Sequence, residues 1–263
     1  MKQINSTANP LYKSVLRLTR SSRGRREEGT IVLEGVHLVR AYFERFGPEA
    51  LELVVRKSAA THPEVQELAR KATAVTMSDA LFDTLTSVAS PVGILALAPL
   101  PIVLTPINLQ SFQVWLDGIQ DPGNLGAILR SAAAAGASAA HLSADCADPW
   151  SPKSLRGGMG AQLILSVQQH DSLEIAAPNL SPRPIACTAD APLSLFEADL
   201  TGDVAFVLGG EGGGISESIL ALAQQTVRIP MRDGIESLNV GAAAAVCFYE
   251  WVRRRGVVSG TGF

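Results

Sequence analysis

Hydrophobic positions in the first third of the chain alternate between two spacings. Short runs of consecutive apolar residues are typical of buried strands, whereas apolar residues that recur every three or four positions predict amphipathic helices. By this rule, strands are predicted at residues 31–33, 51–55, 74–76 and 93–97. The helices predicted between them cover residues 34–46, 63–71 and 79–85. This alternation predicts a small three-layer α/β domain.

The same alternation starts again at Phe112 and continues to the end of the chain. Strands are predicted at residues 112–116, 139–142, 163–167, 185–188, 204–208 and 227–229. Helical patterns cover residues 124–135, 151–157, 216–222 and 239–254. Strands that are apolar throughout and separated by helices indicate a parallel sheet covered on both faces. In such a sheet, ligands bind at the carboxyl ends of the strands.

Two further features divide the chain into parts. A short amphipathic helix is predicted at residues 9–22, inside an arm that ends at Gly29. Three proline residues, Pro99, Pro101 and Pro106, mark a linker between the two alternating regions. We therefore expect four parts: an arm at 1–29, a small domain at 30–101, a linker at 102–110 and a larger domain at 111–263.

The composition excludes several classes of protein. Of the 263 residues, 47% are hydrophobic and 18% are charged, which excludes a wholly disordered chain. Cys146, Cys187 and Cys247 are far apart and form no CxxC pair, so neither a disulfide scaffold nor a bound metal is expected. Residues 1–13 lack the apolar core of a signal peptide, and no apolar run reaches the roughly 20 residues of a membrane span. A reduced, cytoplasmic protein without membrane contact is expected.

Charge is distributed unevenly along the chain. The net charge is −3, yet residues 1–29 hold seven of the 22 Lys and Arg residues and only two of the 25 Asp and Glu residues. A basic arm on an acidic body is typical of proteins that contact a polyanion. A solvated helix without a specific ligand is the alternative. The candidate contact residues are Lys13, Arg17, Arg20, Arg23, Arg25 and Arg26.

A glycine-rich segment follows the predicted strand at 204–208. It reads Leu-Gly-Gly-Glu-Gly-Gly-Gly-Ile-Ser, precedes a predicted helix, and so lies where a nucleotide-like ligand approaches backbone. The dinucleotide motif GxGxxG requires glycine at Ile215 or Glu217, and the P-loop motif requires lysine at Ile215. Both templates fail, which argues against a nicotinamide-dependent oxidoreductase and against a phosphate cradle. Because Glu211 would repel phosphate, a cationic or phosphate-free ligand fits better.

Two other segments lie between a predicted strand and a predicted helix. Residues 117–126 contain Asn124, and Arg130 follows six residues later. Residues 229–241 contain Ser237 and Asn239 and lead into the last helix. Taken singly, helix capping accounts for the two asparagines and the serine, and a surface ion pair accounts for the arginine. The order of all three segments is more informative than any one of them.

Together and in this order, the segments resemble the motifs of the SpoU/TrmH family of RNA ribose 2′-O-methyltransferases, within the SPOUT class. The first motif is matched by Pro122, Asn124, Gly126 and Arg130. The second is matched by Gly209, Glu211, Gly212 and Gly214. The third is matched by Pro230, Met231, Ser237, Leu238 and Asn239. The N-terminal part resembles the ribosomal-protein-L30e-like substrate-binding domain of family members that act on ribosomal RNA.

The resemblance implies an α/β fold whose C-terminal parallel-sheet domain contains a deep trefoil knot, an exception to the usual unknotted topology. It also implies a homodimer whose active site draws on both subunits, and S-adenosylmethionine as the cofactor. The residues that it places at the cofactor are Leu208, Gly209, Gly210, Glu211, Gly214, Ile229, Met231, Leu238 and Asn239. Gly210, Gly213 and Gly241 depart from the commonest family pattern, but none is a residue usually assigned to the chemistry.

The catalytic residues implied by the resemblance are Asn124, Arg130, Ser237 and Asn239. A guanidinium is always protonated, so Arg130 suits stabilisation of a developing 2′-alkoxide better than removal of a proton. Asn124 would position the ribose or Arg130, and the other two would hold the nucleotide or complete the cofactor loops. Three roles stay open for Glu211: neutralising a sulfonium, bonding a first-motif residue, or holding its loop.

The expected substrate is 23S-type ribosomal RNA, contacted by the basic residues of the N-terminal arm. Two alternatives stay open. One is the same ribose 2′-O-methylation on transfer RNA, and the other is a catalytically idle RNA-binding or ribosome-assembly factor on the same scaffold. The presence of all four catalytic residues favours an enzyme, and the additional N-terminal domain favours ribosomal RNA.

Overall fold

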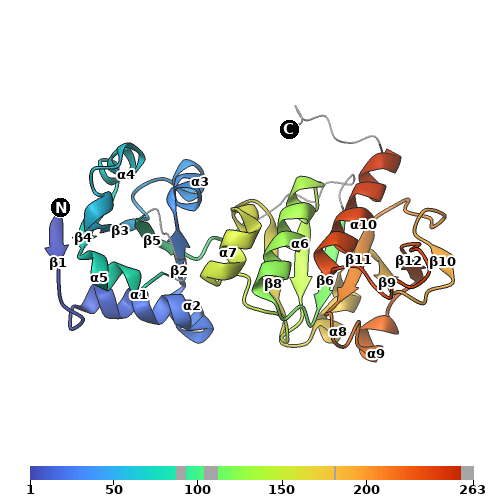
Figure 1. Cartoon of the computed structure of the whole chain (residues 1–263). Coiled ribbons are helices and arrows are strands. Elements are labelled where there is room, and N and C mark those ends of the chain that lie inside the picture. The colour runs from blue at the N-terminus through green and yellow to red at the C-terminus, as the bar shows by residue number, and fades with distance from the viewer. Residues whose placement is uncertain (87–92, 104–111, 181, 256–263) are drawn as a thin grey trace. The chain divides into compact units, whose positions relative to one another are not determined.

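The computed structural model describes residues 1–86, 93–103, 112–180 and 182–255 (Figure 1). The chain forms two compact units. The N-terminal unit comprises Met1–Ile102 and Asp148–Leu163, and the C-terminal unit comprises Val103–Ala147 and Ile164–Phe263. Asp148–Leu163 thus pack with the N-terminal unit, although the boundaries expected from sequence place them in the larger domain. Most of the expected linker, 104–110, lies outside the described residues.

A five-stranded sheet forms the centre of the N-terminal unit, in the order β1-β4-β3-β5-β2. Its strands are β1 (Lys2–Ile4), β2 (Thr30–Glu34), β3 (Glu52–Arg56), β4 (Thr73–Met77) and β5 (Ile94–Pro99). β5 runs antiparallel to β2 and β3, and the other pairs are parallel. The sequence pattern predicts β2 to β5 but misses β1, because Lys2-Gln3-Ile4 contains no apolar run and joins the sheet through backbone pairing with β4.

Helices cover both faces of this sheet and build two separate cores. On one face lie α1 (Pro10–Arg20) and α5 (Asp79–Asp83). On the other face lie α3 (Val36–Phe46), α4 (Pro63–Ala69) and α7 (Pro152–Gly158). Two short 3-10 helices, Lys57–Ala59 and Ala161–Leu163, complete the unit. The result is the three-layer α/β arrangement that the alternating pattern predicts.

The basic segment after α1 folds as a helix, α2 (Ser22–Glu28), that has no apolar stripe to predict it. The Ser21 hydroxyl accepts the Gly24 N–H (2.9 Å), and Gly29 ends the helix in the left-handed region. Arg25 is 4% exposed and donates from Nε to the Asp148 carboxylate (2.9 Å). Arg25 therefore holds the returning segment 148–163, which corrects its prediction as an RNA contact.

A seven-stranded, fully parallel sheet forms the centre of the C-terminal unit, in the order β10-β12-β9-β11-β6-β7-β8. Its strands are β6 (Gln113–Asp117), β7 (Ala139–Leu142), β8 (Ser166–Gln169), β9 (Arg183–Cys187), β10 (Leu193–Ser194), β11 (Val204–Gly209) and β12 (Gln225–Arg228). The predicted parallel sheet is confirmed. The strand predicted at 163–167 starts later, because Leu163 belongs to a 3-10 helix that packs in the N-terminal unit.

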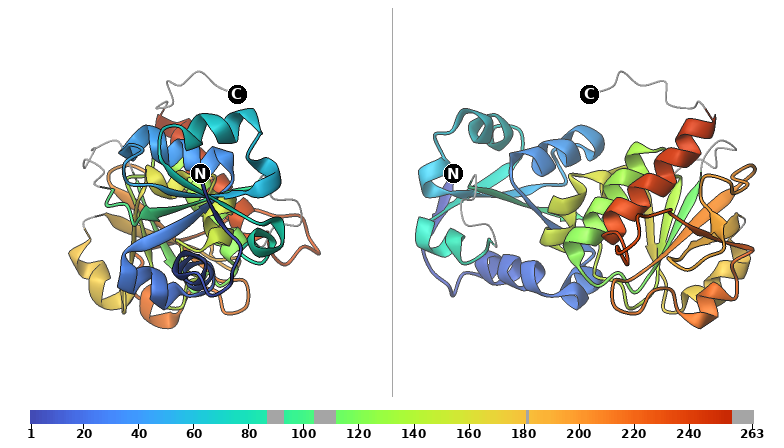
Figure 2. Two further views of the ribbon diagram at one scale, coloured as in Figure 1. Left: turned by 90° about the vertical axis from the view of Figure 1, so that its left-hand side faces the viewer. Right: turned by 45° about the vertical axis from the view of Figure 1, so that its right-hand side comes forward.

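Helices also cover both faces of the parallel sheet. α6 (Pro122–Ala134) and α10 (Val240–Arg255) lie side by side on one face (Figure 2). The other face is covered by α8 (Leu173–Ala176), the 3-10 helix Ala177–Asn179 and α9 (Glu217–Leu220). No helix within the described ranges combines the length and apolar character that a membrane crossing requires.

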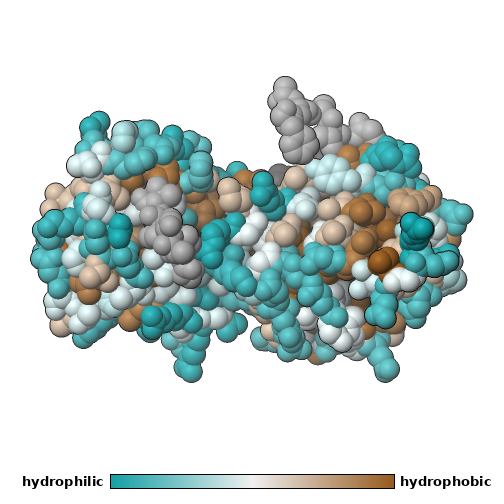
Figure 3. Space-filling view, in the orientation of Figure 1, coloured by the Kyte–Doolittle hydropathy of each residue, from teal (hydrophilic) through white to brown (hydrophobic). Residues whose placement is uncertain are grey.

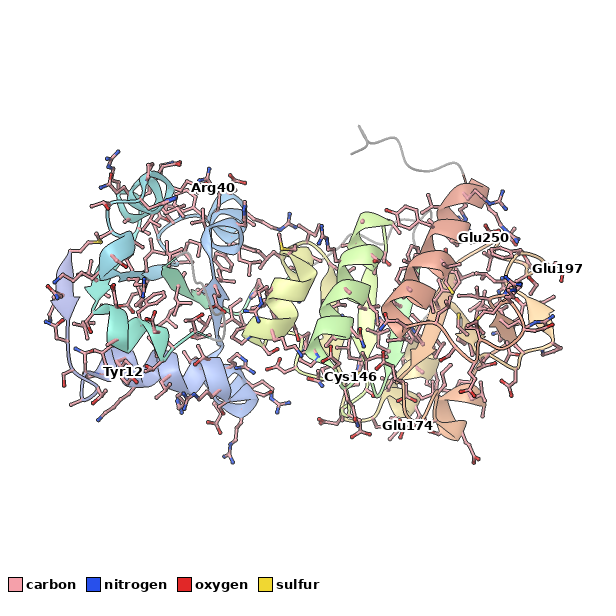
Figure 4. All side chains as sticks on the ribbon, viewed as in Figure 1. Tyr12, Arg40, Cys146, Glu174, Glu197 and Glu250 are labelled. Atoms are coloured by element: carbon pink, nitrogen blue, oxygen red, sulfur yellow. The ribbon has the colours of Figure 1, made fainter. Side chains whose placement is uncertain are left out.

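A buried carboxylate anchors the end of α10. Glu250, whose side chain is 5% exposed, accepts from Arg253 Nε (2.8 Å) and from Arg254 Nε (2.7 Å) (Figure 4). The hydrogen bond from Arg253 is the main reason that the pKa of Glu250 falls from about 4.5 to about 2. Because the folded-state pKa is depressed, this carboxylate stabilises the fold above pH 4.5 and loses that effect as the pH falls towards 2.

We expect Glu250→Gln to lower the free energy of unfolding at pH 7 by about 1–2 kcal/mol. The pKa difference corresponds to about 3 kcal/mol, and solvent screening at the exposed Arg253 reduces it. Denaturant unfolding at pH 7 and pH 3 measures the effect, which should shrink by more than half at the lower pH. Glu197→Gln is the matched control, since this residue, labelled in Figure 4, is exposed and has no ion pair among the described residues. Equal effects at both pH values would contradict the assignment.

Candidate active site

Three loops meet at the carboxyl ends of the strands in the C-terminal unit. Residues 118–121 follow β6, residues 210–216 follow β11, and residues 229–239 follow β12 and lead into α10. Two cavities, of about 700 Å³ and about 250 Å³, lie among these loops. This is the edge of the sheet at which the sequence predicts ligand binding.

The smaller cavity, named here the apolar cavity, brings together eight of the nine residues that the resemblance places at the cofactor. They are Leu208, Gly209, Gly210, Glu211, Gly214, Ile229, Met231 and Leu238. Ser237 also lines this cavity, and Asn239 does not. The apolar side chains suit a flat heterocycle, and the described lining contains no Lys or Arg that would select a phosphate.

The larger cavity, named here the acidic cavity, is lined by four carboxylate residues. They are Asp117, Asp121, Asp145 and Glu211. Gly210, Glu211, Gly214 and Val240 line both cavities, so the two are adjoining halves of one site. The described lining of this half also lacks Lys and Arg. Its charge therefore favours a cationic group over a free anion.

The loop after β11 is a tight turn that requires glycine at particular positions. A Cβ at Gly209 would lie within 3.0 Å of backbone atoms of Gly214. Gly214 itself has a φ of +66°, in the left-handed region. The Gly210 N–H donates to the Asp117 carbonyl (2.9 Å), and the Gly214 N–H donates to the Gly210 carbonyl (2.9 Å). The turn leaves Glu211 exposed at its tip.

One side chain from each of the three predicted motifs meets the others in a hydrogen-bonded triangle. Asn124 Nδ2 donates to Glu211 Oε1 (2.8 Å), and Asn239 Nδ2 donates to the same oxygen (3.0 Å). Asn239 Nδ2 also lies 3.1 Å from Asn124 Oδ1. Of the three roles left open for Glu211, bonding to a first-motif residue is therefore the one that this geometry realises.

The two asparagines differ in their local roles. Asp121, not Asn124, caps α6: its carboxylate accepts the Asn124 N–H (2.8 Å). Asn124 lies inside the first turn, so its side chain is available to the triangle. Asn239 does cap its helix, because its Oδ1 accepts the Gly241 N–H (2.9 Å) while its Nδ2 reaches Glu211.

Arg130 is not part of this triangle. It is exposed on α6, six residues and therefore about 120° around the helix from Asn124. It lines neither cavity, and no hydrogen bond or ion pair joins it to another described residue. The structure thus brings Asn124 and Asn239 together, places Ser237 at the apolar cavity, and leaves Arg130 outside the site of its own chain.

The six candidate RNA-contact residues of the N-terminal arm fall into three groups. Lys13, Arg20 and Arg26 are exposed and form no ion pair within the described part of the chain. Arg17 pairs with Glu28 and Arg23 pairs with Glu27, so their charges are partly neutralised. Arg25 is buried, as described above.

Several residues that line the cavities were not predicted as site residues, among them Asp117, Asp145 and Val240. Asp117 is the last residue of an apolar strand, and a carboxylate at that place was a usable signal. Asp145 and Val240 gave no such signal, because their positions depend on how β7 and α10 pack beside β6 and β11. Within the described ranges, no three His, Cys, Asp or Glu residues are grouped so as to hold a metal ion, and the cysteines are free thiols.

The fold and site define an α/β protein with a candidate ligand site at the carboxyl edge of a parallel sheet. Residues 111–249 match the model of the SpoU rRNA Methylase family, and residues 9–96 match the MRM3-like substrate binding domain. The chain therefore belongs to the SpoU rRNA methylase family.

Two curated relatives illustrate the similarity. The chain is 32% identical over 268 residues to an uncharacterized tRNA/rRNA methyltransferase of Synechocystis, with 98% of this chain and 96% of the relative covered. It is 38% identical over 143 residues to the 23S rRNA (guanosine-2′-O-)-methyltransferase RlmB of Xanthomonas campestris. That second match covers 53% of this chain and 57% of the relative, so it spans little more than half of RlmB.

Solved structures share the fold over nearly the whole chain. The crystal structure of an RNA 2′-O ribose methyltransferase matches with a TM-score of 0.81 and 31% identity, covering 97% of this chain and 100% of that one. The SpoU methyltransferase AviRb of Streptomyces viridochromogenes, in complex with AdoMet, matches with a TM-score of 0.85 and 24% identity, covering 95% and 99%.

Proposed function

We propose that this chain transfers a methyl group from S-adenosylmethionine to a ribose 2′-OH of ribosomal RNA, in the cytoplasm. The observation that carries the proposal is the triangle of Asn124, Glu211 and Asn239, which joins three family motifs at the boundary of two adjoining cavities. The matched family and an MRM3-like substrate-binding domain favour ribosomal over transfer RNA. Retention of the motif residues favours an enzyme over an idle scaffold.

The apolar cavity fits the adenosine part of the cofactor. Leu208, Ile229, Met231 and Leu238 offer apolar contact to adenine, and the adjoining glycine backbone offers hydrogen-bonding groups to the ribose. The carboxylate of Glu211 lies where the two cavities meet, a favourable place for a cationic sulfonium. S-adenosylmethionine supplies the methyl group and the chemical driving force.

The residues of the chain then have to position the ribose and assist the loss of the 2′-OH proton. Asn124, held by Glu211 and Asn239, orients the 2′-OH for in-line attack, and such orientation lowers a barrier by several kcal/mol. Arg130 stabilises the alkoxide that develops as the proton leaves, because a guanidinium donates strong hydrogen bonds but accepts no proton. Water or an RNA phosphate oxygen takes up the proton.

Because Arg130 lies outside the site of its own chain, we propose that it serves the site of a second copy in a homodimer. Ile235, Leu238 and Tyr249, on α10 and the loop before it, are exposed apolar residues. Figure 3 shows apolar surface over this part of the C-terminal unit. An apolar patch of this kind favours association with another protein surface.

We also propose that the C-terminal unit contains the deep trefoil knot of the SPOUT class. The support is the family membership and the parallel sheet in which β11 lies between β6 and β9. A crystal structure in which neither residues 210–216 nor residues 229–239 pass through a loop of the chain would contradict it.

The function is tested first by calorimetric titration with S-adenosylmethionine and S-adenosylhomocysteine, with NADH as the control. We expect micromolar binding of the methionine derivatives and none of NADH. A radiolabelled-methyl assay on ribosomal and transfer RNA, followed by digestion to nucleosides, then identifies the product. A 2′-O-methylated nucleoside from ribosomal RNA supports the proposal. Label confined to transfer RNA, label on a base, or cofactor binding without methylation of any RNA would each contradict part of it.

A prediction for the basic arm follows from its unpaired charges. Replacing Lys13, Arg20 and Arg26 together with glutamine should raise the KM for RNA about 10- to 100-fold at low salt and leave the affinity for the cofactor unchanged. The affinity for RNA falls as the salt concentration rises, and each lost phosphate contact should also make the slope of log affinity against log salt less steep by roughly 0.7–0.9. Steady-state methylation kinetics measure the KM, and filter binding at several salt concentrations measures the slope.

The matched control replaces Arg17 and Arg23, whose charges are already paired within the chain. Its KM for RNA should change less than three-fold. If the control and the triple variant behaved alike, the distinction between paired and unpaired arginines would be wrong.

A further inference from the structure

A buried carboxylate outside the predicted motifs holds the glycine loop of the site. Asp117, the last residue of β6, is 9% exposed, and no ion pair joins it to a cation among the described residues. A buried carboxylate is costly unless hydrogen bonds replace its lost hydration. The partners of Asp117 therefore indicate what its burial achieves.

Those partners lie at the far end of the loop after β11. Asp117 Oδ2 accepts from the Ser216 N–H (2.8 Å) and from the Ser216 hydroxyl (2.6 Å). At the near end of the loop, the Asp117 carbonyl accepts the Gly210 N–H (2.9 Å). One residue thus binds both ends of residues 210–216.

The composition of the loop makes such an anchor necessary. Five of the six residues 209–214 are glycine, and each glycine loses more conformational freedom on ordering than any other residue. Ser216 precedes α9, a helix of four residues, and its side chain accepts no backbone N–H of that helix. Its hydroxyl lies 3.4 Å from the Ser218 hydroxyl and makes its shorter hydrogen bond, of 2.6 Å, to Asp117. Asp117 thus fixes the two ends of the loop, in addition to the Gly214–Gly210 hydrogen bond within it and the hydrogen bonds of Glu211 at its tip.

The loop also contributes residues to the candidate active site. Gly209, Gly210 and Gly214 line the apolar cavity, and Glu211 at the tip holds both Asn124 and Asn239. A displacement of the loop would therefore alter the cofactor cavity and release the triangle together. We infer that Asp117 is a positioning residue, which pre-orders the glycine loop for the cofactor and for Glu211. The link to the cofactor rests on the proposed function, whereas the link to the loop does not.

The first test uses no ligand. Hydrogen exchange of the amides at residues 210–216 should accelerate at least 10-fold in Asp117→Asn and more in Asp117→Ala. Glu174→Gln is the matched control: this exposed carboxylate on α8 lines neither cavity, and no hydrogen bond joins its side chain to another described residue. The loop of this control should exchange as in the wild type. Equal exchange in the Asp117 and Glu174 variants would overturn the inference.

The second test measures S-adenosylhomocysteine affinity by calorimetry. The Kd should rise at least 10-fold in Asp117→Asn, about three-fold in Ser216→Ala, which keeps the backbone contact, and less than two-fold in Glu174→Gln. If exchange accelerates but the wild type binds no S-adenosylhomocysteine, the proposed cofactor fails while the role of Asp117 in the loop stands. Accelerated exchange with an unchanged Kd would overturn the cofactor part of the inference.

A rescue variant separates positioning from general destabilisation. A Cβ at Gly213 meets nothing within 4 Å, and the backbone there is outside the left-handed region. Gly213→Ala should therefore reduce the number of backbone conformations open to the loop without causing a steric clash. In the double variant with Asp117→Asn, Gly213→Ala should raise the affinity for S-adenosylhomocysteine at least three-fold over Asp117→Asn alone. It should also slow the hydrogen exchange of the amides at residues 210–216. A lack of recovery, with a melting temperature that falls in proportion to affinity, would assign Asp117 a merely structural role.

Discussion

Replacing Arg130 with alanine should lower kcat for RNA methylation by about 100- to 1,000-fold, with the affinity for S-adenosylmethionine within about two-fold of wild type. The loss is this large because a fixed cation beside a developing oxyanion contributes roughly 3–4 kcal/mol to transition-state stabilisation. Cofactor affinity persists because Arg130 lines neither cavity. Arg130→Lys should be intermediate, since an ammonium keeps the charge but lacks the planar two-pronged donor set.

Single-turnover methylation and calorimetry separate the two effects. If Arg130→Ala abolished cofactor binding, the assignment of this residue to the transition state would be wrong. A loss in KM for RNA with an unchanged kcat would assign it to substrate binding alone.

Subunit mixing tests whether Arg130 acts across a dimer. Arg130→Ala chains keep their cofactor cavity, and Gly209→Ala chains keep their arginine. In a heterodimer of the two, one site is complete only if the arginine comes from the other chain. Random re-association should then restore about a quarter of the wild-type sites. No restoration, with heterodimers demonstrated by mass spectrometry, would place Arg130 in its own chain's site or remove it from the mechanism.

The second large effect is expected at Gly209, where alanine should weaken S-adenosylmethionine binding at least 100-fold. The added Cβ would lie within 3.0 Å of backbone atoms of Gly214 and Ile215, which cannot rotate away as a flexible side chain would. The loop must therefore shift, and it forms part of the apolar cavity wall. Calorimetric titration measures the loss directly.

Gly212→Ala is the control for this substitution. A Cβ there meets nothing within 4 Å, and the residue has no left-handed φ, so the affinity should change less than three-fold. A Gly209→Ala protein that binds the cofactor normally would show that the loop adapts to the extra methyl group. A Gly209→Ala protein that melts more than about 10 °C lower would indicate a failure of the β11–β6 packing rather than of the site.

The parallel sheet could be predicted from sequence because both of its faces are buried. β6, β7 and β11 are apolar almost throughout, so each is visible as a run that ends within one residue of the observed strand. β1 and β10 are too short and too polar to form such a run, and both exist through pairing with β4 and β12. α2 is stabilised by its caps and by burial of Arg25, not by an apolar stripe.

The sequence by itself, through its resemblance to the family motifs, determined which side chains to expect at the candidate site. Asn124, Glu211 and Asn239 stand in three ordered segments, each at a strand-to-helix connection, and the resemblance of these segments to the family motifs singles them out. The tertiary structure alone decided how they are connected. Asn124 and Glu211 are 87 residues apart, and Asn239 and Asn124 are 115 apart, so their hydrogen bonds depend on the order of strands in the sheet. Long-range packing also places residues 148–163 in the N-terminal unit, buries Arg25 against Asp148, and leaves Arg130 outside the site of its own chain. None of these could be predicted from the sequence, because contacts between distant residues produce no periodic pattern of hydrophobic positions.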